Sequence, residues 1–236
     1  MKLYHSPRSR SVRARWLLEE IGAPYELVTF DLSKGEQKTP EYMKIHPHGA
    51  VPALVDGDVA LFESSAICMY LADKFPEKHL APPVGTPARG LYYQWMVYSV
   101  ATLEPPVLQV FLNTIMLPEA QRSAAAADEG RQKFAEVARV LSQALTGKTF
   151  LLGEQLSAAD VMIGSTLAWS QSMGLLSGHP VLEAYTKRLT ERPAYKRAED
   201  RTRRQGRPRH PNPLPRGGDA RERELRLPDD SAVEEA

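Results

Sequence analysis

The chain has 236 residues, of which 42% are hydrophobic and 25% charged, and its formal net charge is +1. This is an ordinary globular composition, and the balanced charge argues against a nucleic-acid or acidic-membrane partner. The start, MKLYHSPRSR, lacks the apolar core of a secretory signal, and no apolar run approaches the roughly 18 residues that span a bilayer. A single cysteine, Cys68, excludes an intramolecular disulfide and suits a reducing cytosol. We therefore expect a cytoplasmic protein.

The N-terminal part of the sequence alternates between strand and helix patterns. Short apolar stretches bounded by turn residues indicate strands, and apolar residues at helical spacing indicate helices. Gly22 is a good helix end, and Asp56-Gly57-Asp58 predicts a hairpin turn. The order of elements predicts an α/β domain with a four-stranded mixed sheet of thioredoxin type. The predicted strands are residues 1–4, 24–32, 51–55 and 59–62, and the predicted helices are residues 11–20, 40–43 and 63–75.

From Ala88 onward the strand patterns disappear, and long stretches with helical spacing predict an all-α C-terminal domain, a helical bundle. Its helices are expected at residues 88–117, 119–145, 157–173, 181–191 and 194–203. The tail is rich in Arg and Pro, and too poor in large apolar residues to offset its ordering entropy, so we expect it to be disordered. The predicted division is a thioredoxin-like domain at 1–78, a Pro-rich linker at 79–87, a helical domain at 88–202 and the tail at 203–236.

Two residues of the predicted second domain and one cysteine are expected to be structural. Ser157 and Asp160 have the S-x-x-D spacing of a capping box before an apolar helix. Cys68 lies between apolar neighbours on a predicted helix, which is typical of a buried structural thiol.

The stretch HPHGAVPALVDGD contains a proline where a strand is expected to begin. Because proline cannot donate to a strand ladder, Val51-Pro52 fits a cis bond with the strand edge left open. Such a bond presents the backbone N–H and C=O of Val51 to a ligand peptide, which pairs like an additional strand. An ordinary turn before a hairpin is the alternative interpretation.

Glu63 and Ser64 lie in LFESSAI, where a predicted strand passes into a helix. A helix N-terminus offers free N–H groups and a partial positive charge, which together favour a carboxylate. Ser64 can add a hydroxyl donor and Glu63 can accept from an ammonium group, so the pair can bind the head of a free amino acid. The alternative is that Ser64 or Ser65 only caps the helix.

Three serines, Ser6, Ser9 and Ser11, lie in the loop before the first predicted helix. A hydroxyl at this place can donate to a thiolate, with help from the helix dipole. Lowering a thiol pKa by about 2 units needs roughly 2.7 kcal/mol, which one charge-assisted hydrogen bond and a helix terminus can supply. Capping of the helix by Ser9 or Ser11 is the simpler interpretation, and the two roles are compatible.

These elements, in this order, resemble the glutathione transferase superfamily. The resemblance covers roughly residues 1–200 and rests on YHSPRSRSVRARWLLEE, PEYMKIHPHGAVPALVDGDVALFESSAICMYLADKF and FLLGEQLSAADVMIGSTLAW. It implies that glutathione is the co-substrate, with its cysteinyl part paired to the Val51 backbone and its γ-glutamyl head at Glu63 and Ser64. The implied glutathione-binding residues are Lys38, His48, Val51, Pro52, Glu63 and Ser64.

The resemblance also points to the group that activates the thiol. Serine-type classes of the superfamily carry this Ser four residues before an Arg that opens the helix, and Ser9 and Arg13 match that spacing. The expected catalytic residues are therefore Ser9 and, as a second candidate, Ser11. Tyr4 is the alternative by comparison with tyrosine-type classes, whereas cysteine-type classes need a Cys in this loop, where the sequence has none.

The electrophile site is expected between the two domains, over the glutathione sulfur, and its candidates are Tyr92, Trp95, Met96, Ser99 and Trp169. The resemblance thus implies a detoxifying enzyme that conjugates the glutathione thiolate to a hydrophobic electrophile. It also implies a homodimer. No metal-ligand spacing appears in the sequence, so we expect no metal. One alternative is a glutathione-dependent disulfide reductase, peroxidase or dehalogenase on the same site. The other is a binding protein of the same fold without turnover.

Overall fold

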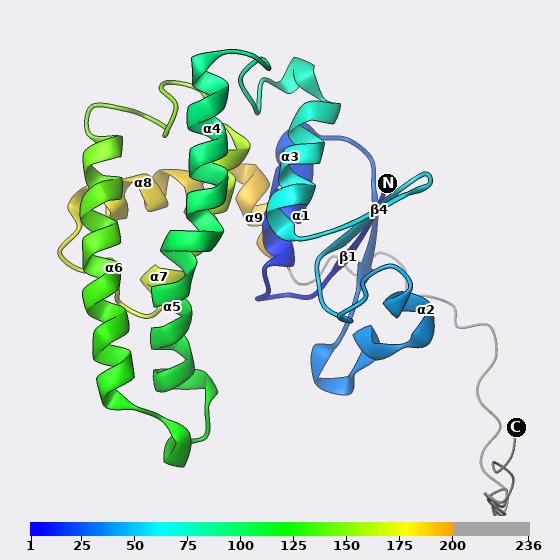
Figure 1. Ribbon diagram of the computed structural model, residues 1–236. Helices are drawn as coiled ribbons and strands as arrows, with labels where there is room; N and C mark the ends of the chain where they lie inside the picture. The colour runs from blue at the N-terminus through cyan, green and yellow to red at the C-terminus, as the bar shows by residue number, and fades with distance from the viewer. Residues whose placement is uncertain (201–236) are drawn as a thin grey trace, which may run out of the picture.

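The computed structural model describes residues 1–200, in which a strand-containing N-terminal part lies beside a helical part (Figure 1). The predicted tail and the last residues of the final predicted helix lie outside the described residues. Within residues 1–200, no helix combines the length and the apolar character that crossing a membrane requires.

The four strands form one mixed sheet in the order β2-β1-β3-β4, as the sequence predicts. Strand β1 (Lys2–His5) is parallel to β2 (Glu26–Thr29) and antiparallel to β3 (Ala53–Asp56), which pairs antiparallel with β4 (Val59–Phe62). Strand β3 begins two residues later than expected, because Pro52 has no N–H for the ladder.

Helices cover both faces of this sheet. Helices α1 (Ser11–Ile21) and α3 (Ser64–Lys74) pack together on one face, between the sheet and the helical part (Figure 1). Helix α1 ends at Gly22, whose φ of 74° lies in the left-handed region that glycine adopts without strain. The short helix α2 (Pro40–Met43) belongs to the other face, where Tyr42 joins a small second core with Val28, Phe30 and Ala53.

The first helical run after the linker has the predicted extent but is less regular than the sequence predicts. Helix α4 (Pro87–Tyr98) passes through a wide π-helical turn, Ser99–Leu103, into α5 (Glu104–Phe111), and a second wide turn, Leu112–Met116, follows. Helix α5 starts with Glu104-Pro105-Pro106. Two consecutive prolines cannot donate backbone hydrogen bonds to the preceding turn, which accounts for the irregularity at this point.

The remaining helices follow the predicted order with small shifts at their ends. Helix α6 begins at Ala124 rather than Glu119, because Ser123 caps it by accepting from the Ala126 N–H at 3.2 Å. These helices are α6 (Ala124–Leu145), α7 (Ala158–Ser172), α8 (Pro180–Thr190) and α9 (Pro193–Glu199).

One continuous core joins the sheet side to the helical side. The ring of Trp16 on α1 packs edge-on against Tyr195 on α9, with 4.8 Å between centroids. Gly164 on α7 permits close approach, because a Cβ there would lie 2.4 Å from Leu189 and 3.3 Å from Trp16. Cys68 lies in the same core, and burial raises the pKa of its thiol to about 12, so the prediction of a buried structural thiol is confirmed.

Asp160 holds the start of α7 by more contacts than a capping box alone provides. Its carboxylate accepts from the Ser157 N–H at 2.8 Å and the Ser157 hydroxyl at 2.7 Å. It also accepts from the Leu151 N–H at 2.8 Å and the Tyr185 hydroxyl at 2.7 Å. Burial raises the pKa of this carboxyl, which the four donors oppose. Asp160 therefore ties α7 to α8 and to the preceding loop.

We expect Asp160→Ala to lower the free energy of unfolding by about 3 kcal/mol, because it leaves several buried donors without an acceptor. Urea denaturation measures the effect. Asp128→Ala is the matched control, since Asp128 pairs with Arg131 at the surface, and it should change stability by less than about 1 kcal/mol. Equal stability of the two variants would contradict the structural role of Asp160.

Candidate functional site

The three loop serines before α1 have different surroundings. The Ser9 side chain is half-buried, and its hydroxyl lies 2.7 Å from the Ser6 carbonyl oxygen and 2.6 Å from Ser11 Oγ. Ser9 Oγ also accepts from the Ser11 N–H at 3.2 Å, the first N–H of α1, whereas the cap position itself is Arg10, whose side chain makes no cap hydrogen bond. Ser9 therefore contacts the helix start while part of its surface stays accessible.

Ser11 is enclosed behind Ser9. It is 0% exposed, and its Oγ lies 2.8 Å from His5 Nδ1 and accepts from the Ser6 N–H at 3.0 Å. This placement corrects the expectation that Ser11 is an equivalent catalytic candidate, because a fully buried hydroxyl cannot reach a ligand sulfur. The Tyr4 side chain points away from the loop serines, because it lies on the opposite face of β1 from His5 and packs against Phe30 and Tyr42.

The peptide bond between Val51 and Pro52 is cis, as the sequence predicts. The half-buried Val51 comes just before β3, and the Tyr42 hydroxyl fixes the preceding residue by donating to the Ala50 carbonyl at 2.5 Å. The Val51 backbone thus lies at the entrance of β3, outside the strand ladder.

Glu63 and Ser64 lie where β4 passes into α3. Glu63 is exposed and has a φ of 71°, a left-handed conformation that turns the chain sharply into the helix. The first backbone bond of α3 runs from Ile67 N–H to Glu63 O, so the N–H groups of Ser64, Ser65 and Ala66 precede the helical ladder. Ser64 is 5% exposed, and its Oγ accepts from Arg13 Nη1 at 3.2 Å. Because a guanidinium only donates, the Ser64 hydroxyl proton remains available to another acceptor.

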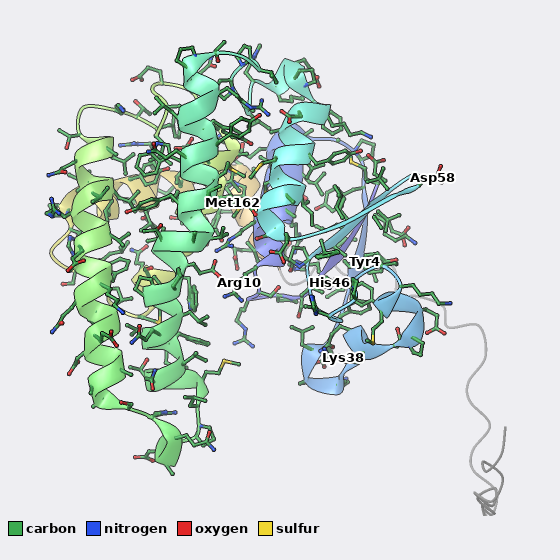
Figure 2. All side chains as sticks on the ribbon, in the orientation of Figure 1. Tyr4, Arg10, Lys38, His46, Asp58 and Met162 are labelled. Carbon is green, nitrogen blue, oxygen red and sulfur yellow. The ribbon has the colours of Figure 1, made fainter. Side chains whose placement is uncertain are left out.

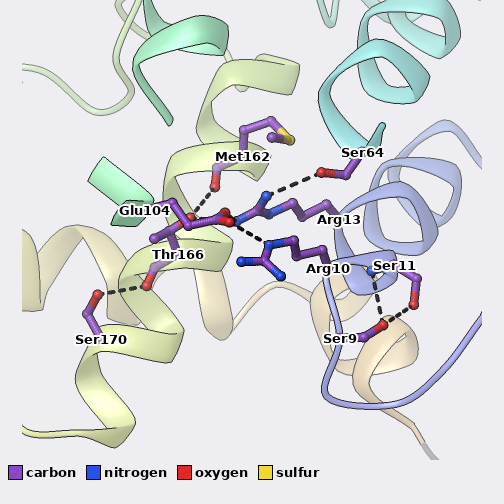
Figure 3. A network of polar contacts seen from close by, with 9 residues as sticks. All are labelled: Ser9, Arg10, Ser11, Arg13, Ser64, Glu104, Met162, Thr166 and Ser170. Carbon is purple, nitrogen blue, oxygen red and sulfur yellow. Dashed lines mark hydrogen bonds and ion pairs between the residues drawn. The ribbon is translucent and has the colours of Figure 1, made fainter. Parts of the chain in front are cut away.

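Arg13 forms a buried ion pair that the sequence analysis did not identify. Its side chain is 2% exposed and contacts the Glu104 carboxylate at the start of α5 (Figure 3). Its Nη2 also donates to Thr166 Oγ1 on α7 at 2.8 Å. The sequence offers only the Glu-Pro-Pro stretch as a signal here, and nothing in it pairs Glu104 with Arg13. This ion pair joins α1 and the start of α3 to two helices of the second domain.

Arg10 shares the same carboxylate from the other side. Its Nε donates to Glu104 Oε1, whereas its side chain is 47% exposed (Figure 3). Among the described residues, its two terminal nitrogens have no hydrogen-bond partner. Figure 2 shows Arg10 at the boundary between the sheet side and the helical side. Two guanidinium groups thus share one carboxylate beside Ser9, which leaves one net positive charge.

Lys38 lies at the edge of the N-terminal part, near His46 (Figure 2), and contacts the backbone of His48. Lys38 Nζ donates to the His48 carbonyl at 2.7 Å, and both side chains are exposed. Gly49 makes this approach possible, because a Cβ there would lie 2.8 Å from the Gln37 carbonyl oxygen. The contact brings the loop before α2 against the turn before Val51.

Four of the five predicted electrophile contacts belong to the core. Tyr92 and Met96 are fully buried, Ser99 is 0% exposed, and Trp95 is 7% exposed. Their helical spacing reflects packing of α4 against the core, so they offer no open surface to a substrate. Trp169 is half-buried and packs edge-on against Phe111 at 5.3 Å between centroids, so it is the one candidate with partial access.

Ser9, Arg10 and Ser64 lie where the two parts of the fold meet, a boundary that we call the seam (Figure 3). These three residues offer a hydroxyl, a cation and the N-terminus of α3 (Figure 3). Val51 adds a peptide edge before β3, and Glu63 adds a carboxylate before α3. These groups suit a short extended peptide with a free amino-acid head. Within residues 1–200, the structure brings together no group of three His, Cys, Asp or Glu side chains that could hold a metal ion.

The sequence matches two protein families in chain order. Residues 1–73 match the glutathione S-transferase N-terminal domain, and residues 103–193 match the glutathione S-transferase C-terminal domain. Glutathione S-transferase F10 of Arabidopsis thaliana is 36% identical over 68% of this chain and 76% of its own length. Glutathione S-transferase GST-4.5 of Xanthomonas campestris is 30% identical over 80% of this chain and 92% of its own.

Solved structures show the same likeness in three dimensions. A sphingomonad glutathione S-transferase complexed with glutathione aligns with a TM-score of 0.74 at 28% identity, over 84% of this chain and 97% of that protein. Glutathione transferase F7 of Populus trichocarpa aligns with a TM-score of 0.76 at 25% identity, over 84% of this chain and 96% of its own.

Removing one partner of the buried ion pair between Arg13 and Glu104 should destabilise the fold. We expect Glu104→Gln to lower the free energy of unfolding by about 3 kcal/mol, because the Arg13 charge then stays buried without a counter-charge. Urea denaturation provides the measurement. Glu191→Gln is the control, since Glu191 faces Lys187 at 3.9 Å on the surface. A Glu104→Gln protein as stable as this control would show that the pair does not join the two parts.

Proposed function

The chain belongs to the glutathione S-transferase family, and we propose that its enzyme activity joins the glutathione thiolate to a hydrophobic electrophile, with Ser9 holding the thiolate. The observation that carries the proposal is the placement of the loop hydroxyls. Ser11 is enclosed, whereas Ser9 is half-buried and keeps part of its surface accessible. Of Ser9 and Ser11, only Ser9 can therefore donate to a ligand sulfur.

The reaction needs a thiolate and a place for the thiol proton. The glutathione thiol releases its proton to solvent, and the thiolate accepts the Ser9 O–H. The sulfur lone pair then forms a C–S bond with the electrophilic carbon, and the leaving group departs with its bonding electrons. A charge-assisted hydrogen bond at the sulfur raises the fraction of thiolate at neutral pH, which is the contribution of the protein to the chemistry.

The other groups of the seam support binding of the tripeptide in one orientation. The Ser64 hydroxyl and the N–H groups that begin α3 suit the γ-glutamyl carboxylate, and exposed Glu63 suits its ammonium group. The Val51 backbone suits the cysteinyl peptide group. Lys38, held beside His48, suits the glycine carboxylate. Among the predicted electrophile contacts, Trp169 remains in the proposal.

The alternative activities are less well supported by this arrangement. A disulfide reductase that acts through its own thiol needs an accessible cysteine, and Cys68 is fully buried with a raised pKa. Peroxidase and dehalogenase reactions of glutathione, and a binding protein without turnover, stay predictions from the sequence. The domain boundaries and the cytoplasmic location also stay predictions from the sequence.

A homodimer forms part of the proposal. Helix α4 exposes Leu91, Tyr93 and Val97, of which Val97 is 55% exposed, and β4 exposes Val59 and Phe62. Large apolar side chains gathered on one helix and one edge strand support a protein–protein contact, because water contact with them is unfavourable.

Ser9→Ala tests the role of the hydroxyl. We expect the thiol pKa of bound glutathione to rise by about 2 units, which lowers the thiolate fraction at neutral pH about a hundredfold. Ultraviolet absorbance of the thiolate against pH gives this pKa, and turnover of an aryl halide gives kcat. Ser177→Ala, at an exposed serine, is the control. An unchanged thiol pKa in Ser9→Ala would refute the assignment of Ser9.

Light scattering tests the dimer. We expect the mass of a dimer for the unaltered chain and the mass of a monomer for Leu91→Glu with Val97→Glu, because two charges would then be desolvated at the contact. Val140→Glu on α6 is the control and should remain dimeric, since Val140 is 38% exposed on another helix. A monomeric unaltered chain would overturn this part of the proposal.

A further inference from the structure

A buried chain of hydrogen bonds leads from Ser9 into the protein. Ser9 Oγ lies 2.6 Å from Ser11 Oγ, and Ser11 Oγ lies 2.8 Å from His5 Nδ1. His5 is 1% exposed and Ser11 is 0% exposed, so water cannot supply a proton or a lone pair to the inner members. The inner groups must therefore find their partners in one another and in the Ser6 backbone, whose N–H donates to Ser11 Oγ and whose carbonyl oxygen contacts both serine hydroxyls.

Each of these two contacts is a hydrogen bond, with one proton between its two heavy atoms. At 2.6 Å, two hydroxyl oxygens repel each other unless one of them donates to the other, and the same applies to Nδ1 and Oγ at 2.8 Å. Each serine has a single hydroxyl proton to place. The direction of the whole chain is therefore fixed once the proton on His5 is placed.

The two neutral forms of His5 give opposite directions. With the ring proton on Nε2, Nδ1 must accept from Ser11, and Ser11 must then accept from Ser9. In this arrangement the single hydroxyl proton of Ser9 points to Ser11 and is not available to a ligand. With the ring proton on Nδ1, His5 donates to Ser11, Ser11 donates to Ser9, and the Ser9 proton is free to point outward.

The Ser6 carbonyl oxygen distinguishes the two directions, because it lies 2.7 Å from Ser9 Oγ and 3.0 Å from Ser11 Oγ. In the first direction both hydroxyl protons point elsewhere and this oxygen receives neither, whereas in the second direction it accepts from Ser9, the nearer hydroxyl. Ser11 Oγ then accepts from His5 Nδ1–H and from the Ser6 N–H at 3.0 Å, which uses both of its lone pairs. Ser9 Oγ accepts from the Ser11 hydroxyl and from the Ser11 N–H at 3.2 Å, which uses both of its own. The Ser9 proton is directed at the Ser6 carbonyl oxygen at 2.7 Å in the absence of a ligand.

We propose that His5 is a positioning residue for the transferase reaction, which keeps its proton on Nδ1 and so aims the Ser9 hydroxyl proton at the glutathione sulfur through Ser11. This inference rests on the proposed role of Ser9. When glutathione binds, the proton turns from the neutral Ser6 carbonyl to the thiolate, because a charged acceptor forms the stronger hydrogen bond.

The surroundings of His5 keep the ring neutral. Burial and the neighbouring Arg15 guanidinium lower the pKa of His5 to about 3. The ring therefore carries a single proton at neutral pH, and its place on Nδ1 or Nε2 is a matter of hydrogen bonding alone. A neutral imidazole also adds no positive charge to the environment of the buried Arg15.

The position of the proton can be measured on the unaltered protein. Nitrogen NMR of the ¹⁵N-histidine-labelled chain distinguishes the two neutral forms by the shifts of Nδ1 and Nε2, and His5→Asn identifies the His5 signals by their loss. We expect the His5 proton on Nδ1, both without and with bound glutathione. A His5 protonated on Nε2 in the glutathione complex would overturn the inference.

Two substitutions separate the hydrogen bond from packing. His5→Asn places an amide N–H near the position of Nδ1, whereas His5→Leu fills similar space without a donor. We expect His5→Leu to raise the thiol pKa of bound glutathione by about 1 unit and to lower kcat/KM for glutathione about tenfold at neutral pH. His5→Asn should restore most of both. Equal thiol pKa values in the two variants would contradict the inference.

The serines make the test specific to this chain of hydrogen bonds. In a Ser9→Ala background, His5→Leu should not change the thiol pKa further, because no hydroxyl remains to be aimed at the sulfur. If Ser9→Ala itself leaves the thiol pKa unchanged, the proposed role of Ser9 fails. If Ser9→Ala raises the thiol pKa and His5→Leu does not, only the role of His5 fails.

Discussion

The buried ion pair between Arg13 and Glu104 determines how the two parts of this fold meet. A guanidinium that is 2% exposed is stable only with a counter-charge nearby, and α1 provides none in its own first turn. The counter-charge comes from the start of α5, and Thr166 on α7 supplies a further acceptor. The helical part must therefore lie against α1 in one register, and the seam that holds the site follows from that constraint.

The same guanidinium also organises the two ends of the site. One of its nitrogens donates to Ser64 and thereby fixes the hydroxyl at the start of α3 with its proton turned away from Arg13. Its partner Glu104 holds Arg10 through Nε and leaves the other end of that side chain exposed beside Ser9. A residue that packs the two parts together thus also sets the direction of donors in the proposed glutathione site. In that proposal, binding geometry and domain packing depend on the same buried charge.

The sequence predicted the elements of the fold well, because their signals are local. Gly22 ends α1, the Asp56-Gly57-Asp58 turn joins β3 to β4, and the cis bond lies at Pro52, each where a single residue type restricts the backbone. Four of the five electrophile candidates are buried in the structure, and the reason is the opposite one. Tyr92 and Met96 show helical spacing, and spacing alone does not say whether a stripe faces a cleft or the core. The pair of Arg13 and Glu104 spans 91 positions, and no local pattern encodes such a contact.

The serine loop shows why a site is harder to predict than a fold. Ser9 and Ser11 are the same residue type, two positions apart, and either can cap a helix or donate to a sulfur. Their roles can be distinguished only when burial is known, since Ser9 is half-buried and Ser11 is fully enclosed. Burial then makes hydrogen-bond direction consequential, because an enclosed hydroxyl cannot exchange partners with water. For the same reason His5, which belongs to no recognisable sequence motif, affects Ser9. His5 is the buried end of the hydrogen-bond chain, and the position of its ring proton decides whether the Ser9 hydroxyl proton can point to a ligand.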